Sequence, residues 1–362
     1  MIVTEQAARY SNAMGSDAGY RHKEAGTRKM GYEFASAENI GDRKEQQDRV
    51  ALTSHARHAD VVMAVLADGM GGHAGGAIAS QAVIDAVTPM FDAFDPATGS
   101  PRDWLKGMLM AAHDKVAKAG RGFDQDPRST GVIALAQKNR IDWAHCGDSR
   151  LYAFRHGDFV TRTEDHSMVE ILVQQGSITA DQAHMHPDRS KLFTSLGGPE
   201  APQIAYGQFE RVEPGDTILL ASDGLWSYFE PEEMAGLIGY RNLTDGCDRL
   251  VGLARKRAAG NGDNLSVATM RWANGEKKRL LGALFAGKPV EPSPLEDCKR
   301  YVGRVMRANL GAGADRLAER LERASEQGEV LHLIERSEEA LARAAGRSKA
   351  AAFALRAREL LE

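Results

Sequence analysis

Four aspartates in this chain lie where an apolar, strand-like stretch meets a turn. Three of them follow such a stretch and the fourth comes just before one; they are Asp68, Asp148, Asp223 and Asp263. A single Asp-Gly pair usually marks a turn, because Asp bonds its own backbone and Gly tolerates a positive φ. Four carboxylates at the ends of neighbouring buried strands would instead repel one another and resist desolvation. Because a cation would stabilise such a cluster, the pattern predicts a metal site.

The donor atoms indicate which metal this cluster would hold. Carboxylate and carbonyl oxygens, without clustered Cys or His, suit Mg²⁺ or Mn²⁺ better than zinc or copper. An acidic cage can hold two such ions about 3.5–4 Å apart, and a water shared between them loses a proton near neutral pH to give a hydroxide. That chemistry serves the hydrolysis of a phosphate monoester, which is among the slowest of uncatalysed reactions.

Three more residues suit a phosphate ester. Arg43 can bind two phosphate oxygens in a bidentate manner, although an arginine at this position can equally be an ordinary surface residue. His73 can protonate the leaving alkoxide as a general acid, or it can be a histidine that a Gly-rich loop exposes by chance. Glycine lets the backbone approach an ion closely, so the carbonyl of Gly69 is a candidate metal ligand.

Short strands and two helices must position these residues. Apolar runs predict strands at 61–67, 132–136, 141–146, 151–154, 218–221 and 265–272. Strands this close are joined by hairpins, since a parallel crossover needs a dozen residues or more, so we expect residues 132–163 to form an antiparallel meander. Helical spacing of apolar residues predicts helices over about 75–93 and 102–119. Antiparallel sheets flanked by helices make an α+β layered domain.

The two ends of the chain differ from this central part. Residues 1–30 are polar and aperiodic, which predicts a flexible tail, and residues 274–294 have the Gly, Lys and Pro content of a linker. Ser293 is followed by Pro and then Glu at the positions that start a helix. Apolar stripes predict a helical C-terminal module over 295–362, and we expect it to bind a partner, to drive oligomerisation or to regulate, without being needed for hydrolysis.

Composition limits the class of protein. The 362 residues suggest two domains or one domain with an appendage, and 43% apolar with 27% charged residues is ordinary for a globular protein. A net charge of −4 argues against a nucleic-acid-binding protein. The three cysteines form no CxxC pair, which favours a reducing cytoplasm over a disulfide framework or a zinc site. The chain has neither a run of ~20 apolar residues nor a signal-peptide pattern, so we expect no membrane attachment.

Six ordered motifs resemble those of the metal-dependent protein phosphatases of type 2C in their bacterial form. The motifs are R-x4-D, D-G-M-G-G-H, G-D-S-R, D-H-S, S-D-G-L and D-N-x-S-V, found here at 43–48, 68–73, 147–150, 165–167, 222–225 and 263–267. They cover about residues 31–273 and keep the order and spacing of that family. The resemblance implies a central antiparallel β-sandwich with helices on both outer faces, and the hydrolysis of phosphoserine and phosphothreonine in proteins.

The resemblance also implies a binuclear Mn²⁺ or Mg²⁺ centre. In that centre Asp68 would bridge both ions. Asp223 and Asp263 would complete the protein ligands of the first ion. The carbonyl of Gly69 would contact the second ion, and Asp48 would serve it directly or through water.

The same resemblance implies roles for three other residues. Asp148 with Asp223 matches the site of a weaker third ion, Arg43 matches the arginine that binds the substrate phosphate, and His73 matches the proposed general acid. One departure concerns the second ion. Many relatives have Asn-Glu-Asp where this chain has Gln-Gln-Asp, so Gln47 offers no charged ligand.

Residues 165–205 are expected to form an excursion from the sheet. Ser167 opens a capping box for a short helix, Gly176 can end that helix, and Thr179 opens a second capping box. The excursion resembles the family's mobile flap, which is implicated in substrate choice. The polar residues that can contact a phosphopeptide there, or belong to an ordinary polar surface, are His184, His186 and Arg189.

Two functions remain open. The first is a cytoplasmic phosphatase that acts on the phosphoprotein products of a serine/threonine kinase, by in-line attack of a metal-bound hydroxide and without a covalent phosphoenzyme. The second is a phosphatase-like module that docks a phosphoprotein without turnover, which missing metal ligands would favour. Asp68, Asp223 and Asp263 are all present, so the residues favour the enzyme. We expect neither nucleic acid nor membrane as a partner.

Overall fold

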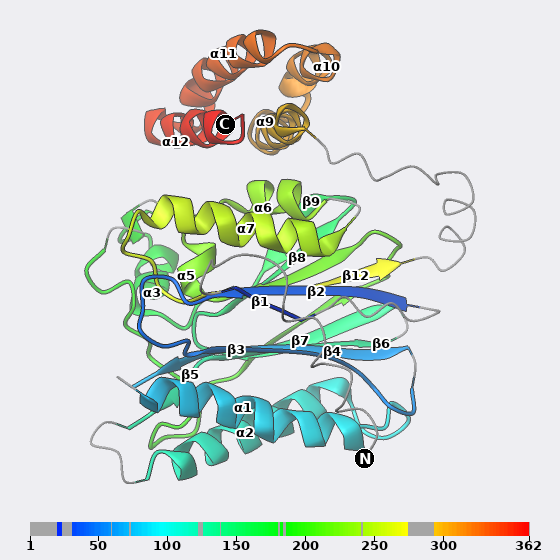
Figure 1. Cartoon of the computed structure of the whole chain (residues 1–362), viewed down its shortest axis with the longest axis vertical. Coiled ribbons are helices and arrows are strands. Elements are labelled where there is room, and N and C mark those ends of the chain that lie inside the picture. Colours follow the sequence, from blue (N-terminus) through cyan, green and yellow to red (C-terminus); the bar gives the residue numbers. More distant parts are fainter. Residues whose placement is uncertain are drawn as a thin grey trace.

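Two antiparallel sheets pack face to face, and helices cover the outer side of each sheet (Figure 1). The computed structural model describes residues 20–23, 31–58, 60–71, 74–121, 126–137, 139–179, 182–183, 186–239, 242–273 and 293–361. This arrangement confirms the expected α+β sandwich with helical flanks. Apart from a four-residue strand at 20–23, the predicted N-terminal tail lies outside the described residues, as does nearly all of the predicted linker.

The first sheet joins strands from distant parts of the chain, in the order β1-β2-β12-β11-β8-β9. Their bounds are β1 Tyr20–Lys23, β2 Gly31–Asn39, β12 Leu265–Ala273, β11 Thr217–Ala221, β8 Arg150–Arg155 and β9 Asp158–Arg162. Strand β12 lies between β2 and β11, with Leu265 opposite Asn39 and Val267 opposite Ala221. The end of β11 and the start of β12 therefore lie at the same end of the sandwich.

The second sheet has the order β10-β7-β6-β4-β3, and the short strand β5 pairs with the end of β4. The bounds are β10 Ala205–Glu210, β7 Arg140–Cys146, β6 Gly131–Gln137, β4 Val61–Met70, β3 Asp48–Ser54 and β5 Arg128–Ser129. Side chains of β4 alternate between two buried clusters, since Val65 packs toward the helices and Leu66 packs between the sheets. Burial on both faces explains why β4 is a continuous apolar run.

One connection of the predicted meander over 132–163 is wrong. Strands β6 and β7 pair as a hairpin, and so do β8 and β9, but β7 and β8 belong to different sheets. The chain crosses between the layers at 147–149, where Gly147 has a φ of +104° that side-chain-bearing residues rarely adopt. The hairpin rule excludes a short parallel crossover within one sheet, but it does not exclude a short arch to the facing sheet.

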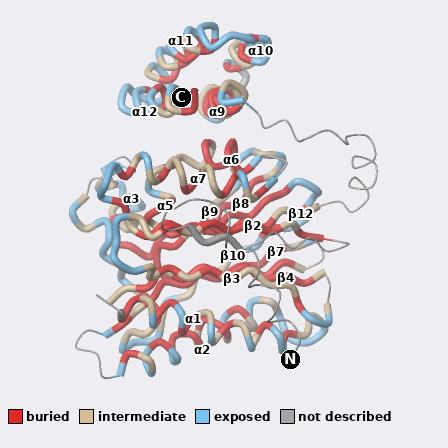
Figure 2. The backbone as a smooth tube through the Cα atoms, in the orientation of Figure 1, coloured by how far each residue is buried: buried red, intermediate tan, exposed pale blue. Residues whose placement is uncertain are grey.

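The helices that cover the second sheet confirm the periodicity analysis. They are α1 Ala74–Ala93 and α2 Pro101–Ala119, and the Ser100 side chain caps α2 by accepting a bond from the Asp103 amide. The helices on the first sheet, which the sequence analysis did not predict, are α5 Asp223–Trp226, α6 Pro231–Ile238 and α7 Leu243–Ala258. Figure 2 shows that the central strands of both sheets are buried, as are the helix faces that meet them.

The C-terminal helices form a further layer that packs on α6 and α7 (Figure 1). They are α9 Pro294–Leu310, α10 Asp315–Arg323, α11 Gln327–Ala345 and α12 Arg347–Glu359, with a 3₁₀ turn at Gly311–Ala314. As predicted, Ser293 caps α9. Buried Tyr301 of α9 belongs to the same apolar cluster as Met234 of α6 and Leu250 of α7. The module therefore shares its core with the rest of the chain, and side chains fill the gap between the ribbons in Figure 1.

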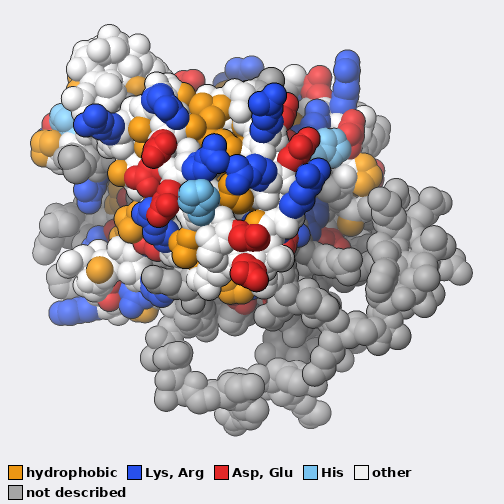
Figure 3. All heavy atoms as spheres, turned by 90° about the horizontal axis from the view of Figure 1, so that it is seen from above, with side chains coloured by type: hydrophobic (Ala, Val, Ile, Leu, Met, Phe, Trp, Pro, Cys, Tyr) orange, Lys and Arg blue, Asp and Glu red, His pale blue; other side chains and the backbone are white. Residues whose placement is uncertain are grey.

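Polar contacts also join the module to α6 and α7. Arg257 of α7 pairs with Glu359 of α12 at 2.9 Å, and Arg356 of α12 pairs with Glu230 at 3.1 Å. Figure 3, which looks down on the molecule from above, shows basic and acidic side chains intermixed on that face. In the part of the chain that the structure describes, no helix is long and apolar enough to cross a membrane.

Candidate metal centre

Five aspartates from five separate positions along the chain converge at one end of the sandwich. Asp48 starts β3 and lies opposite Asp68 near the end of β4. The other three lie where β11 ends, where β12 is about to start and where the chain crosses from β7 to β8; they are Asp223, Asp263 and Asp148. The structure therefore brings together all four aspartates of the sequence pattern, and also Asp48, which only the resemblance had indicated.

The cluster is crowded with like charges, and it reaches from buried Asp48 and Asp148 to Asp263 at the surface. Burial raises the pKa of the Asp68 carboxyl well above its usual range, and the four neighbouring carboxylates raise it further. Burial likewise raises the pKa of Asp148 and of Asp223. Burial raises the pKa of Asp48 to about 7, although the hydroxyls of Ser222 and Ser266 oppose the shift. So many buried carboxylates can all ionise at neutral pH only when positive charge enters the cluster.

The residues fit hard divalent cations. All the side-chain donors are oxygens, and the Oδ2 atom of buried Asp48 has no hydrogen-bond partner among the described residues. The cationic Arg43 donates to Asp263 Oδ2 at 2.6 Å, but this pair lies at the exposed mouth and leaves the deeper carboxylates uncompensated. No three Asp, Glu, His or Cys side chains within the described ranges already surround one point at ligand distance. The evidence that these residues fit a divalent cation is therefore their burial, their oxygen donors and the Asp48 Oδ2 atom without a hydrogen-bond partner among the described residues.

The backbone around Asp68 is fixed by its neighbours. Its amide donates to the Thr130 hydroxyl at 2.9 Å, and its carbonyl accepts bonds from the Thr130 amide and the Ser129 hydroxyl. A Cβ atom on Gly69 would lie 1.9 Å from the carbonyl oxygen of Gly76, so this position requires glycine for packing against the start of α1. That requirement is independent of the predicted role of the Gly69 carbonyl as a ligand.

The loop that carries Arg43 is held by a residue that the sequence analysis named only as part of a motif. The Asn264 side chain accepts a bond from the Gln47 amide at 2.7 Å and donates to the carbonyls of Ile40 and Glu45. Asn264 therefore ties the start of β12 to the loop before Asp48. His73, the predicted general acid, lies outside the described residues.

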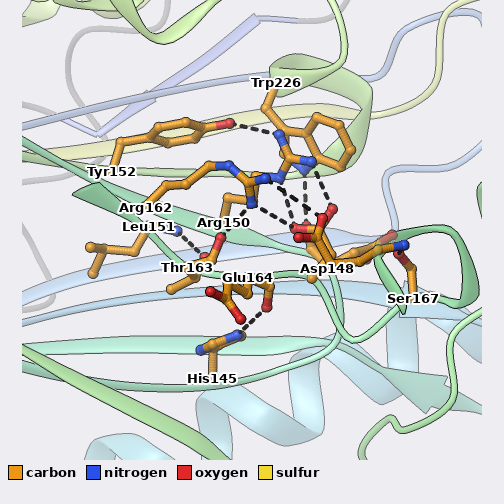
Figure 4. Close-up of polar contacts among 12 residues, drawn as sticks. His145, Asp148, Arg150, Leu151, Tyr152, Arg162, Thr163, Glu164, Ser167 and Trp226 are labelled. Atoms are coloured by element: carbon orange, nitrogen blue, oxygen red, sulfur yellow. Dashed lines mark hydrogen bonds and ion pairs between the residues drawn. The ribbon is translucent and has the colours of Figure 1, made fainter. Parts of the chain in front are cut away.

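A largely buried arginine, Arg150, supports the residues beside Asp148 (Figure 4). The guanidinium of Arg150 donates to both carboxylate oxygens of Asp165 at 2.8 and 2.7 Å, and to the Tyr152 hydroxyl at 3.1 Å. It also stacks over the Trp226 ring at 3.3 Å from the centroid. The indole nitrogen of Trp226 donates to the Asp148 carbonyl at 2.9 Å. Because Trp226 ends the short helix that begins with Asp223, this network holds Asp148 and Asp223 in a fixed relation.

The Asp-His-Ser motif has structural roles beside this network. Asp165 binds Arg150, the ring of His166 stacks on His145 at 4.7 Å between centroids, and Ser167 caps the short helix α3 Met168–Gln174. The His166 Nδ1 atom accepts a bond from the Gly147 amide at 3.2 Å. Burial lowers the pKa of His166 to about 4, so this ring is neutral near pH 7 and can accept that bond.

Comparison with known proteins gives the same assignment as the motifs. A family model for protein phosphatase 2C matches residues 37–252, a span that includes Asp48, Asp68, Asp148 and Asp223. This chain belongs to the protein phosphatase 2C family.

Relatives with known names include bacterial phosphatases. The chain is 32% identical over 214 residues to a putative protein phosphatase 2C-type protein of Streptococcus pyogenes. The alignment covers 58% of this chain and 85% of the relative. It is 33% identical over 244 residues to the serine/threonine protein phosphatase PstP of Mycobacterium tuberculosis. This alignment covers 64% of this chain and 45% of PstP. The chain therefore spans less than half the length of PstP.

A solved structure gives the spatial comparison. The crystal structure of the catalytic domain of PstP in complex with two manganese ions superimposes with a TM-score of 0.58 at 29% identity, covering 68% of this chain and all of that one. The similarity confirms the phosphatase 2C fold. That relative of this chain was crystallised with two manganese ions.

The excursion expected at 165–205 has the local geometry that the sequence predicted. The Ser167 side chain accepts from the Glu170 amide, Gly176 has a φ of +70° just after α3, and Thr179 and Gln182 exchange side-chain to backbone bonds at 2.8 and 3.3 Å. Arg189 is exposed, whereas the His186 ring accepts a bond from the Asp188 amide within its own turn. His184 lies outside the described residues.

The cysteines of this phosphatase lack the environment of nucleophiles. All three are buried, and burial raises the pKa of Cys146 to about 11 and that of Cys298 to about 12. Cys298 and Arg304 have the spacing of a Cys-x5-Arg loop, but both lie within helix α9, and the Cys298 thiol donates to the Ala357 carbonyl. Helical backbone bonds its own amides, so this segment cannot surround a phosphate.

Proposed function

We propose that this chain, a protein serine/threonine phosphatase by its family, hydrolyses phosphoserine and phosphothreonine in proteins at the aspartate cluster. The observation that carries the proposal is the crowding of four carboxyls whose pKa values burial raises, those of Asp48, Asp68, Asp148 and Asp223, next to a fifth carboxylate, Asp263, at the mouth. The groups that would hold two Mn²⁺ or Mg²⁺ ions are the carboxylates of Asp48, Asp68, Asp223 and Asp263 and the carbonyl of Gly69. Asp148, together with Asp223, would hold a weaker third ion.

The role of Arg43 follows from its position, and that of His73 from its place in the motif. When bound, the ions supply a water molecule activated for attack on phosphorus and shield the phosphate charge. The Arg43 side chain is 60% exposed and pairs with Asp263 at the mouth, so its guanidinium can bind two phosphate oxygens once a cation takes over that carboxylate. His73 would give the leaving oxygen its proton. The attack is in line and forms no covalent phosphoenzyme.

The proposal also covers the source of the substrates, the cellular compartment and the role of the C-terminal helices. The substrates would be phosphoproteins made by a serine/threonine kinase in the cytoplasm, where this enzyme would reverse a signal. The C-terminal helices would bind a partner or regulate the enzyme, since they pack directly on the helix layer that follows Asp223. The names of PstP and the other relatives support the substrate class.

The test compares hydrolysis of a phosphothreonine peptide with Mn²⁺ by the natural chain and by the Asp68→Asn variant. The variant keeps the side-chain size but loses the charge that would bridge the ions, so kcat/KM should fall by orders of magnitude. Asp114→Asn, an exposed aspartate on α2, is the matched control and should keep full activity. Equal activity of the natural chain and Asp68→Asn would rule out the proposed role of the cluster.

A further inference from the structure

A groove of about 700 Å³ opens beside the aspartate cluster, on the side of α1 and α2. One wall is the loop that follows Ile40, the opposite wall is the exposed face of α1 around Ile78, and the end of α2 closes the groove at Lys115. Pockets that bind ligands usually enclose about 300–1,000 Å³, so the groove is large enough for several residues of a peptide.

The groove borders the loop and the strand that carry two residues of the proposed catalytic centre, although its lining includes none of the five aspartates. Lys44 on its wall directly follows Arg43, and Arg49 on its floor directly follows Asp48. The Arg49 guanidinium donates to the Asp48 carbonyl at 2.7 Å and to the Gln46 carbonyl at 2.8 Å. Its Nε atom donates to the Gln81 side chain of α1 at 3.1 Å. The floor is therefore held in place by the same strand that carries a proposed metal ligand.

The lining has a mixed apolar and basic character. Ile78 is 37% exposed, which makes it one of the few large apolar side chains left open in the described structure. Lys115 donates to the backbone carbonyl of Asp85 at 2.9 Å, which leaves two of its three ammonium donors for a ligand. The basic residues of the lining, Lys44, Arg49 and Lys115, outnumber the acidic ones, Glu45 and Asp85.

We propose that this groove binds the part of the substrate chain next to the phosphorylated residue, and that it selects segments in which an apolar side chain stands beside acidic ones. This inference rests on the proposed function. With the phosphate at Arg43, an extended substrate places a new side chain about every 3.3 Å along the groove. An apolar side chain packs on Ile78, and carboxylates on either side of it meet the ammonium groups of Lys44 and Lys115.

The experiment uses the full chain and two phosphothreonine peptides of equal length. One peptide has Leu and Asp residues on both sides of the phosphothreonine, and the other has Leu and Lys residues there. The variants are Ile78→Asp and Lys115→Glu. Matched controls are Val160→Asp, an exposed apolar residue on β9, and Lys106→Glu, an exposed lysine of α2 outside the groove lining. Each protein is also tested on p-nitrophenyl phosphate, which is too small to reach the groove.

The natural chain should prefer the acidic peptide, and each groove variant should lower kcat/KM for that peptide about tenfold, a loss of about 1.4 kcal/mol of transition-state binding. Lys115→Glu should also reduce the preference for the acidic over the basic peptide. Hydrolysis of p-nitrophenyl phosphate should stay unchanged in all variants. Unchanged kcat/KM for both peptides in the groove variants would overturn the inference. A natural chain that hydrolyses neither peptide nor p-nitrophenyl phosphate would overturn the proposed function instead.

Discussion

Replacing Trp226 with Phe tests how the proposed metal centre is held together. The change removes the indole N–H that donates to the Asp148 carbonyl at 2.9 Å, and it leaves an aromatic ring over Arg150. A hydrogen bond of this kind contributes a net ~0.5–1.5 kcal/mol, and ~1 kcal/mol corresponds to about fivefold in an equilibrium constant. Because the bond orients the residue proposed to hold the weaker third ion, we expect the Mn²⁺ concentration for half-maximal activity to rise about fivefold.

The assay is a Mn²⁺ titration of phosphothreonine peptide hydrolysis, paired with a thermal unfolding curve. The matched control is Trp104→Phe, because the Trp104 indole also donates to a backbone carbonyl, that of Thr98 at 3.0 Å, away from the aspartates. Both variants should lose similar stability, but only Trp226→Phe should need more Mn²⁺. An unchanged Mn²⁺ requirement in Trp226→Phe would refute the positioning role of the network.

Three further predictions follow from burial. Arg150→Ala leaves the buried Asp165 carboxylate without its bidentate partner, so the free energy of unfolding measured in urea should fall by about 3–5 kcal/mol. A fall below ~1 kcal/mol would contradict a stabilising role for this ion pair. Deleting residues 293–361 removes α9, which packs on α6 within one apolar cluster, so the unfolding temperature should fall by at least ~10 °C. A fall of only a degree or two would show that the module is independent of the rest of the chain. Iodoacetamide near neutral pH should leave the cysteines of the folded protein unmodified, because burial raises the pKa of the Cys146 and Cys247 thiols to about 11 and 12. Labelling of the folded protein as fast as that of the unfolded chain would contradict this prediction.

Features set by neighbouring residues could be predicted from the sequence. The helix caps at Ser167 and Ser293 depend on bonds within three residues, and the structure has both. The aspartates could be found because each stands beside an apolar run. The position of each aspartate beside a turn does not by itself show that their carboxylates lie close together in the fold. Their convergence depends on strand pairing over long distances, as between β2 and β12, and the ordered family motifs supplied that information.

Features set by distant partners could not be predicted. Nothing in the Gly-Asp-Ser segment at 147–149 distinguishes a hairpin from an arch, because both need a tight turn and only the packing of the two sheets decides between them. Trp226 bonds to a carbonyl 78 residues away, and Arg257 meets Glu359 across 102 residues. The apolar stripes of the C-terminal helices predicted burial, but an amphipathic helix does not specify which surface covers it.

Binding of divalent cations by the clustered aspartates can be measured without any substrate. The experiment is an isothermal titration of Mn²⁺ into the natural chain and into Asp68→Asn. We expect the natural chain to bind two ions tightly, and we expect Asp68→Asn, which lacks the carboxylate next to all the others, to lose at least one of them. Identical stoichiometry and affinity in the two proteins would contradict this expectation.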